Sequence, residues 1–413
     1  MKRKAFIFVD TMPDRQGSGA RLRFFSNIQA FLDLGYEVEV INISSRADKI
    51  PDSSELQGVT WTQIEIEEIK NPNFITRLSF RIGLINSHSI KYLFPLSETV
   101  RHEAVKRFQV SPEALFLFDG ESQACVIPWM PKKMLSIWGI HDLPSQNIKA
   151  TINISCDTES RSMTQGETRV VSFMCRFERM MANKSKLVLC IGTDDEEIIT
   201  KEFKCSHAEY LPMSIPINEI SRNKDCPSGK KKLHILHLGA IQHLPSYRSL
   251  EYLFSEIYPA FPEELSDVIN LSIVGKIVDG ERSNYIKELA RPYKNVIFTD
   301  FVDDIFPFYE CSDLQIVAST DSVGIRTRII ESFAYGLPVM STLIGAKGIK
   351  GLKNNENIII ANTPLEFVNA LQALIKYPEK LTIISQNAKE LYWKEHSRPV
   401  VASTLSRLLN THL

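Results

Sequence analysis

The stretch from Ser319 to Thr342 reads STDSVGIRTRIIESFAYGLPVMST and predicts a loop, a helix and a strand. Small polar residues and Gly324 open it, as expected of a loop that leaves a strand. Apolar residues then recur at helical spacing between Thr327 and Tyr335. Gly336 stands where a glycine commonly ends a helix, and the apolar residues after Pro338 begin the next strand. The alternation of strand, helix and strand predicts an α/β fold.

Three charged residues lie on the first turns of this helix. Arg326 and Arg328 suit a phosphate, because a helix N-terminus carries partial positive charge and guanidinium groups pair with phosphate oxygens. Glu331 does not suit a phosphate and indicates a neutral polyol such as ribose. We expect Arg326 and the N–H groups after Gly324 to hold a diphosphate, and Arg328 to point away toward solvent. An ordinary helix with two solvated arginines is the alternative.

The pattern of glycine, the two arginines, Glu331, Ala334, Gly336, Pro338 and Val339 resembles the donor-site signature of nucleotide-sugar glycosyltransferases. It is similar to the group-1, family-4-like enzymes of GT-B fold. The resemblance implies two Rossmann-like doubly wound α/β domains facing a central cleft. It also implies a UDP- or GDP-linked sugar as donor, with its ribose on Glu331.

The sequence departs from this family at two places. Val323 occupies the position at which many members carry a first glutamate. After Gly239, the usual Arg-Lys pair for the phosphates is missing, and Pro245-Ser246 stands where Pro-Asn is common. Gly239 therefore stays a donor-site candidate, while the positive charge has to come from elsewhere.

Composition limits the class of protein. The chain has 413 residues, long enough for two domains, with 44% hydrophobic and 23% charged residues and a net charge of −1. No global basic charge favours nucleic acid. The seven cysteines lack zinc-ligand spacing, and the first apolar run is too short for a signal peptide. We expect a cytoplasmic protein that at most touches the inner face of a membrane.

The first residues predict a strand, a helix and a second strand. Ala5 to Val9 and Val38 to Ile43 are apolar runs typical of buried parallel strands. The loop between them contains the predicted site residues Gly17, Ser18 and Gly19, and Arg23 follows on the helix. By resemblance this loop lies beside donor and acceptor; a tight turn and a surface arginine are the alternative.

Two further predicted strands end in groups suited to proton transfer. Ala114 to Phe118 leads to Asp119 and Glu121, and Met134 to Ile140 leads to His141 and Asp142. Site residues collect at strand ends in open α/β sheets, and histidine exchanges protons near neutral pH. We expect His141 to act beside the transferred sugar, helped by one of these acids. A loop histidine without a chemical role is the alternative.

Residues 71–110 are basic. They contain Arg77, Arg81, Lys91, Arg101, Lys106 and Arg107 against two acids, and Ile75, Leu78, Ile82 and Ile85 mark one helical face. Such a helix can lie on an anionic membrane and engage a lipid-linked acceptor. It can equally cover a sheet with its arginines in water.

Domain boundaries follow from composition. We expect an N-terminal acceptor-side domain at 1–212, a linker at 213–232, a nucleotide-sugar domain at 233–395 and a returning C-terminal helix at 396–413. The linker contains prolines, a glycine and a run of charges.

A glycosyltransferase acting on a polysaccharide, glycolipid or other glycan precursor is the leading hypothesis, with retention implied by resemblance. No Asp-x-Asp occurs, so we expect neither metal nor cofactor, and fixed cations have to stabilise the leaving diphosphate. A sugar-nucleotide epimerase or a catalytically silent partner is the alternative. A nicotinamide oxidoreductase requires GxGxxG after the first strand, which the sequence lacks.

Overall fold

The structure is a computed structural model that describes residues 3–15, 18–44, 50–51, 54–66, 85, 93–158, 160–217, 232–321 and 324–413. The chain divides into two compact units. The first unit comprises Met1–Ser214 together with Arg398–Leu413, and the second comprises Ile215–Ser397. Both are α/β, as the sequence predicts.

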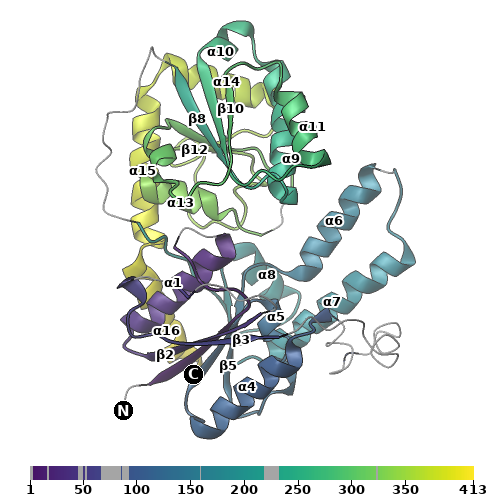
Figure 1. Cartoon of the computed structure of the whole chain (residues 1–413), viewed down its shortest axis with the longest axis vertical. Helices are drawn as coiled ribbons and strands as arrows, with labels where there is room; N and C mark the ends of the chain where they lie inside the picture. The colour runs from purple at the N-terminus through teal and green to yellow at the C-terminus, as the bar shows by residue number, and fades with distance from the viewer. Residues whose placement is uncertain are drawn as a thin grey trace. The chain divides into compact units, whose positions relative to one another are not determined.

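The described strands of the first unit form a seven-stranded parallel sheet in the order β3-β2-β1-β4-β5-β6-β7 (Figure 1). The strands are β1 (Lys4–Val9), β2 (Glu37–Ser44), β3 (Thr60–Glu65), β4 (Leu115–Asp119), β5 (Leu135–Ile140), β6 (Leu187–Cys190) and β7 (Ala208–Tyr210). The chain adds strands outward from β1 in one direction and then returns to place β4 on its other side. Ligands of doubly wound sheets bind where the strand order reverses, here at the carboxyl ends of β1 and β4.

Helices cover both faces of this sheet. They are α1 (Gly19–Asp33), α4 (Ser97–Val110), α5 (Glu121–Ala124), α6 (Pro144–Thr158), α7 (Gln165–Lys184), α8 (Thr193–Lys201) and α16 (Arg398–His412). On one face, α1 and α16 pack against Ile7, Val9 and Leu117. On the other, α4, α7 and α8 pack against Phe8, Phe118 and Trp138. Asp194, Asp195 and Glu196 lie in the first turn of α8, where negative charge suits the helix N-terminus.

The second unit repeats this architecture with a six-stranded parallel sheet among its described residues, in the order β10-β9-β8-β11-β12-β13. Its strands are β8 (Leu233–Leu238), β9 (Ile269–Val274), β10 (Val296–Thr299), β11 (Leu314–Val317), β12 (Val339–Ser341) and β13 (Ile359–Ile360). The α-helices among its described residues are α9 (Leu244–Tyr252), α10 (Glu263–Asp267), α11 (Glu281–Ala290), α12 (Phe306–Glu310), α13 (Thr327–Tyr335), α14 (Pro364–Lys376) and α15 (Glu379–Glu395). The strand order reverses between β8 and β11, so we expect a ligand at their carboxyl ends.

β10 is shorter than its apolar run predicts. The sequence predicts a strand to Val302, but β10 ends at Thr299. Asp300 explains the stop, because its Oδ1 accepts hydrogen bonds from the N–H groups of Ile277 and Phe301 at 2.8 and 2.7 Å. These two backbone N–H groups therefore bind a side chain, and the strand does not continue past Thr299.

Several predicted features lie outside the described residues. These are Gly17, Val323, residues 218–231 of the predicted linker and most of the basic segment, including Arg77 and Arg81. Three cations of that segment, Arg101, Lys106 and Arg107, are described on α4, and Arg107 pairs with Glu39 and Glu103. No helix in the described ranges is long and apolar enough to cross a membrane.

The position of α16 in the first unit predicts its contribution to stability. Leu405 is completely buried, so Leu405→Ala should lower the free energy of unfolding by about 2–5 kcal/mol through lost packing and a cavity. Arg407→Ala, at an exposed position on the same helix, should change it by less than about 0.5 kcal/mol. Urea unfolding followed by circular dichroism measures both. Equal, small changes would show that α16 is not part of this core.

Candidate functional site

In the second unit, a glycine after β8 allows the backbone there to lie close to the start of α9. Gly239 follows Leu238 with φ of +144°, and a Cβ there would lie 2.3 Å from Ser246 Oγ in the first turn of α9. A side chain at 239 is therefore excluded by both backbone conformation and space. The result is a narrow approach between the β8 backbone and the start of α9.

Arg328 fills the space that this glycine leaves. Its guanidinium donates hydrogen bonds to Leu238 O and, at 3.4 Å, to Ser246 Oγ. The expectation that Arg328 points to solvent is wrong. From the first turn of α13, the Arg328 side chain reaches the β8–α9 loop. There one backbone oxygen and one hydroxyl oxygen accept hydrogen bonds from it. Burial lowers the pKa of Arg328 to about 10, so the group stays cationic at neutral pH.

Arg326 binds within its own loop instead. Its Nε donates to Ser319 Oγ at 3.0 Å, and its Nη2 donates to the backbone and side-chain oxygens of Asp321 at 3.0 and 2.5 Å. The side chain is 6% exposed. Arg326 thus braces the loop between β11 and α13, and it is Arg328 that the structure brings to Gly239.

Glu331 lies one turn after these arginines on the same helix. Burial raises the pKa of Glu331 to about 7, and the nearby Tyr309 hydroxyl and Arg328 guanidinium limit the rise. Tyr309 is 1% exposed and comes from α12. Sequence reasoning missed this tyrosine, since nothing in its spacing relates it to Glu331. The helix itself ends at Gly336 in the left-handed conformation, as predicted.

The first unit brings a second group of predicted residues together. His141 Nε2 lies 3.0 Å from Asp119 Oδ1, and Asp119 Oδ2 accepts a hydrogen bond of 2.7 Å from Asn27 Nδ2 on α1. Burial alone lowers the pKa of His141, but the hydrogen bond and charge of Asp119 outweigh it, and the pKa is raised. Burial and the charge of Asp142 raise the pKa of Glu121 to about 7. Of the acids proposed to assist the histidine, Asp119 is the one in direct contact.

Arg23 is not a surface residue. It is fully buried, and its Nη1 donates to the carbonyl oxygens of Leu211 and Pro212 at 2.9 and 3.0 Å. It therefore ties α1 to the segment after β7. Ser18 is the residue before α1 and Gly19 is its first residue, so both lie at the start of this helix.

Another buried acid anchors the segment after His141. Glu178 on α7 accepts hydrogen bonds from Ser145 N and Oγ at 2.7 and 2.5 Å, at the start of α6. Burial raises the pKa of Glu178 to about 7, and the two Ser145 bonds limit the rise. Figure 1 shows α6 and α7 running side by side, and Glu178 fixes the end of α6 nearest the sheet.

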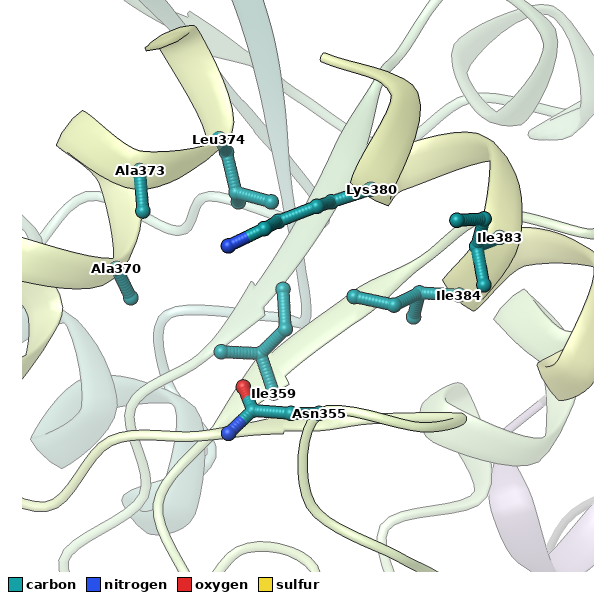
Figure 2. Close-up of a pocket in the computed structure, with 8 residues that line it drawn as sticks. All are labelled: Asn355, Ile359, Ala370, Ala373, Leu374, Lys380, Ile383 and Ile384. Carbon is teal, nitrogen blue, oxygen red and sulfur yellow. The ribbon is translucent and has the colours of Figure 1, made fainter. Parts of the chain in front are cut away.

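A cavity elsewhere in the second unit contains none of these residues. Figure 2 shows a space of about 370 Å³ between α14, α15 and β13, with the side chain of Lys380 extending across it. Its other lining residues are Asn355, Ile359, Ala370, Ala373, Leu374, Ile383 and Ile384. Aliphatic side chains dominate these walls, and Lys380 and Asn355 are the polar residues that line them, so the cavity suits a nucleotide diphosphate poorly.

The fold is the GT-B fold of glycosyltransferases, and solved structures match it over nearly the whole chain. HepE from Anabaena, in complex with UDP and glucose, is 14% identical with a TM-score of 0.66, covering 99% of this chain and 100% of that one. Sucrose-phosphate synthase from Thermosynechococcus elongatus is 14% identical with a TM-score of 0.68, covering 99% of both chains. WaaG, a glycosyltransferase involved in lipopolysaccharide biosynthesis, is 13% identical with a TM-score of 0.62, covering 98% of this chain and 99% of that one.

A family model matches most of the second unit. Residues 232–377 match the model of the glycosyl transferases group 1. The resemblance inferred from the stretch around Glu331 is thereby confirmed. A comparison with curated protein sequences gives no match.

The buried carboxyl of Glu178 predicts a pH dependence of stability. Glu178 has its pKa raised from 4.5 to about 7 by folding, so the folded state binds the extra proton between these values. The stability it contributes is complete below about pH 4.5 and is lost as pH rises through about 7. The loss is about 3 kcal/mol, because one pKa unit corresponds to about 1.4 kcal/mol.

Glu178→Gln cannot ionise and should flatten the decline in stability by that amount, while part of the decline persists through Glu121 and Glu331. Urea midpoints at pH 5 and pH 8 measure the difference. Glu202→Gln, at an exposed position, is the control. A Glu178→Gln protein with the same pH slope as the parent would contradict the interpretation.

Proposed function

We propose that the chain transfers a sugar from a nucleotide-diphosphate sugar to a glycan or lipid-linked acceptor. The observation that carries the proposal is the cluster of Arg328, Gly239 and Glu331 at the carboxyl ends of β8 and β11. The family of the second unit and the GT-B fold support it.

The donor is proposed to bind the second unit through two kinds of contact. Glu331 accepts hydrogen bonds from the ribose hydroxyls. Arg328 and the start of α9 face the diphosphate, whose approach the missing side chain of Gly239 permits. In this arrangement Arg328 supplies the positive charge that the family's Arg-Lys pair supplies in other members. Arg326 serves by holding the loop that precedes α13.

Fixed cations are proposed to take the place of a metal in stabilising the leaving group. Negative charge grows on the diphosphate as the sugar departs, and a preformed guanidinium stabilises that charge without reorganisation. Arg328 is held in position before any ligand binds. We therefore propose a metal-independent reaction, with retention of configuration suggested by the family resemblance.

The first unit is proposed to serve the acceptor and the transferred sugar. His141 lies at the end of β5 in contact with Asp119, and 16% of its side chain is exposed. It is thus suited to bind a hydroxyl or to exchange a proton. The acceptor class comes from analogy: WaaG acts in lipopolysaccharide biosynthesis. We propose a surface-glycan precursor reached from the cytoplasm, where the basic segment can meet an anionic membrane.

Donor identity is proposed from the neighbours as well. HepE has been solved with UDP-glucose, so UDP-linked sugars are the first to test and GDP-linked sugars the second.

Removing the carboxylate of Glu331 should weaken nucleotide binding. A carboxylate that accepts hydroxyl hydrogen bonds contributes about 1.5–3 kcal/mol for each bond. Glu331→Ala should therefore raise the Kd for the bound nucleoside diphosphate by roughly ten- to a hundredfold. Calorimetry with UDP and GDP measures it, and Glu390→Ala on the exposed face of α15 is the control. A folded Glu331→Ala protein that binds like the parent places the ribose elsewhere.

Removing the guanidinium of Arg328 should weaken binding of the diphosphate group and leave binding of the nucleoside unchanged. The affinity of the parent for a nucleoside diphosphate exceeds that for the nucleoside by the contribution of the diphosphate contacts. Arg328→Ala should shrink this ratio by about tenfold or more, because a hydrogen bond to a charged group contributes about 1.5–3 kcal/mol. Glu331→Ala should leave the ratio near its parental value while weakening both ligands.

Competition calorimetry with uridine and UDP, or guanosine and GDP, measures the ratio. Arg291→Ala, at an exposed position in the same unit, is the control. A collapse of the ratio in Arg326→Ala, with none in Arg328→Ala, would return the diphosphate to Arg326.

A further inference from the structure

A buried chain of hydrogen bonds runs from α1 to the histidine of the first unit. Asn27 Nδ2 donates to Asp119 Oδ2 at 2.7 Å, and Asp119 Oδ1 pairs with His141 Nε2 at 3.0 Å. Asn27 is 1% exposed and Asp119 is completely buried. Each carboxylate oxygen thus has its own partner, which fixes the plane of the carboxylate and the direction of its bond to the imidazole.

The same helix adds a charge and a ring beside this pair. Arg23 precedes Asn27 by one turn, so both side chains leave the same face of α1. Its buried positive charge interacts favourably with Asp119 and lowers the pKa of His141. Phe24 packs against the imidazole with 4.9 Å between ring centroids. Residues of α1 therefore contact Asp119 and His141 or alter their electrostatic environment.

A glycine on β5 leaves room for the carboxylate. A Cβ at Gly139 would lie 2.3 Å from Asp119 Oδ1, closer than real Cβ contacts. The carboxylate therefore occupies a space bounded by the β5 backbone on one side and by Asn27 on the other. α1 and β5, which are far apart in sequence, thus both pack against the Asp119 carboxylate.

Holding Asn27 in this position costs stability. Its Oδ1 is buried and has no hydrogen-bond partner among the described residues, an arrangement that destabilises the folded state. A leucine of similar size avoids that cost. The other end of the Asn27 amide explains this polar group, because its Nδ2 donates to Asp119.

We propose that Asn27 is a positioning residue that locks the Asp119 carboxylate onto His141 Nε2, leaving Nδ1 as the ring nitrogen that meets the ligand. In the described part of the chain, no hydrogen bond joins Nδ1 to another residue. With Nε2 donating to Asp119, the neutral ring presents Nδ1 as an acceptor toward a hydroxyl. The ligand part of this inference rests on the proposed sugar transfer; the positioning of the ring does not.

Two roles of Asn27 predict opposite shifts of the His141 pKa. The charged groups facing the ring are Asp119 from β4, Glu121 from α5 and Arg23 from α1, and Asp142 follows it in sequence. If Asn27 merely screens Asp119, removing its N–H strengthens the carboxylate and raises the pKa. If Asn27 positions Asp119, the freed carboxylate rotates off Nε2, burial prevails, and the pKa falls.

Titration of the intact protein by NMR distinguishes the two roles. The His141 ring signal is assigned by its loss in His141→Gln. Asn27→Leu should lower the pKa of His141 by about half a unit or more. Asp119→Asn, which removes the carboxylate itself, should lower this pKa further. Gln29→Leu is the matched control, because Gln29 is a buried amide on α1 that donates at 2.7 Å to Glu55 instead. It should leave the titration unchanged.

If Asn27→Leu does not fold, Asn27→Ser replaces it, because the shorter serine side chain does not reach Asp119. The same fall in the pKa of His141 is expected. A pKa that rises or stays constant in the folded variant overturns the proposal. In turnover assays, Asn27→Leu should lower kcat at least tenfold with an unchanged Kd for the nucleotide. If the parent neither binds nor turns over nucleotide sugars, the proposed function fails, while the titration still decides the role of Asn27.

Discussion

Two parallel sheets covered on both faces leave few places for charged side chains, and the loops at the strand ends are where this chain puts them. The interiors are aliphatic and aromatic: Phe8, Phe118 and Trp138 pack on one face of the first sheet, and Ile7 and Leu117 on the other. A charge among them without a partner is prohibitively costly. Asp119, His141 and Arg328, at or beside the strand ends, are each held by hydrogen-bond partners. The positions of those partners decide what either unit can bind.

Glycines at strand ends give charged groups access to these positions. At Gly239 the absent Cβ leaves space into which Arg328 reaches from α13, and at Gly139 it leaves space for the Asp119 carboxylate. Gly239 directly follows β8 and Gly139 lies near the end of β5, and in both cases the charged group comes from another element. Substituting either glycine would therefore move a charge and alter the chemistry of the site. The two sites are unrelated in sequence but depend on the same constraint.

What the sequence could predict was local. Apolar runs mark most of the strands, and Gly336 ends α13 in the left-handed conformation that a glycine favours. The strand ends carry His141 and Asp119, which meet because neighbouring strands β4 and β5 finish at one edge. The partner of Arg328 was not predictable in this way. Ser246 is 82 residues distant, and spacing on α13 gives no sign of it. Asn27 was missed for the same reason, 92 residues from Asp119.

The arginines of α13 show why a motif identifies a site before it assigns the roles within it. Arg326 and Arg328 are two residues apart, and both match the family pattern. Asp321 neutralises Arg326 at 2.5 Å within its own loop, whereas Arg328 is bound by a carbonyl and a hydroxyl, which carry no net charge. Arg326 is paired directly with a carboxylate, while the hydrogen bonds of Arg328 go to neutral oxygens. The charge that the β8–α9 loop lacks in its own sequence therefore reaches it from a different helix. In the proposed donor site, the cation near Gly239 is thus delivered by α13 and not by the loop that follows β8.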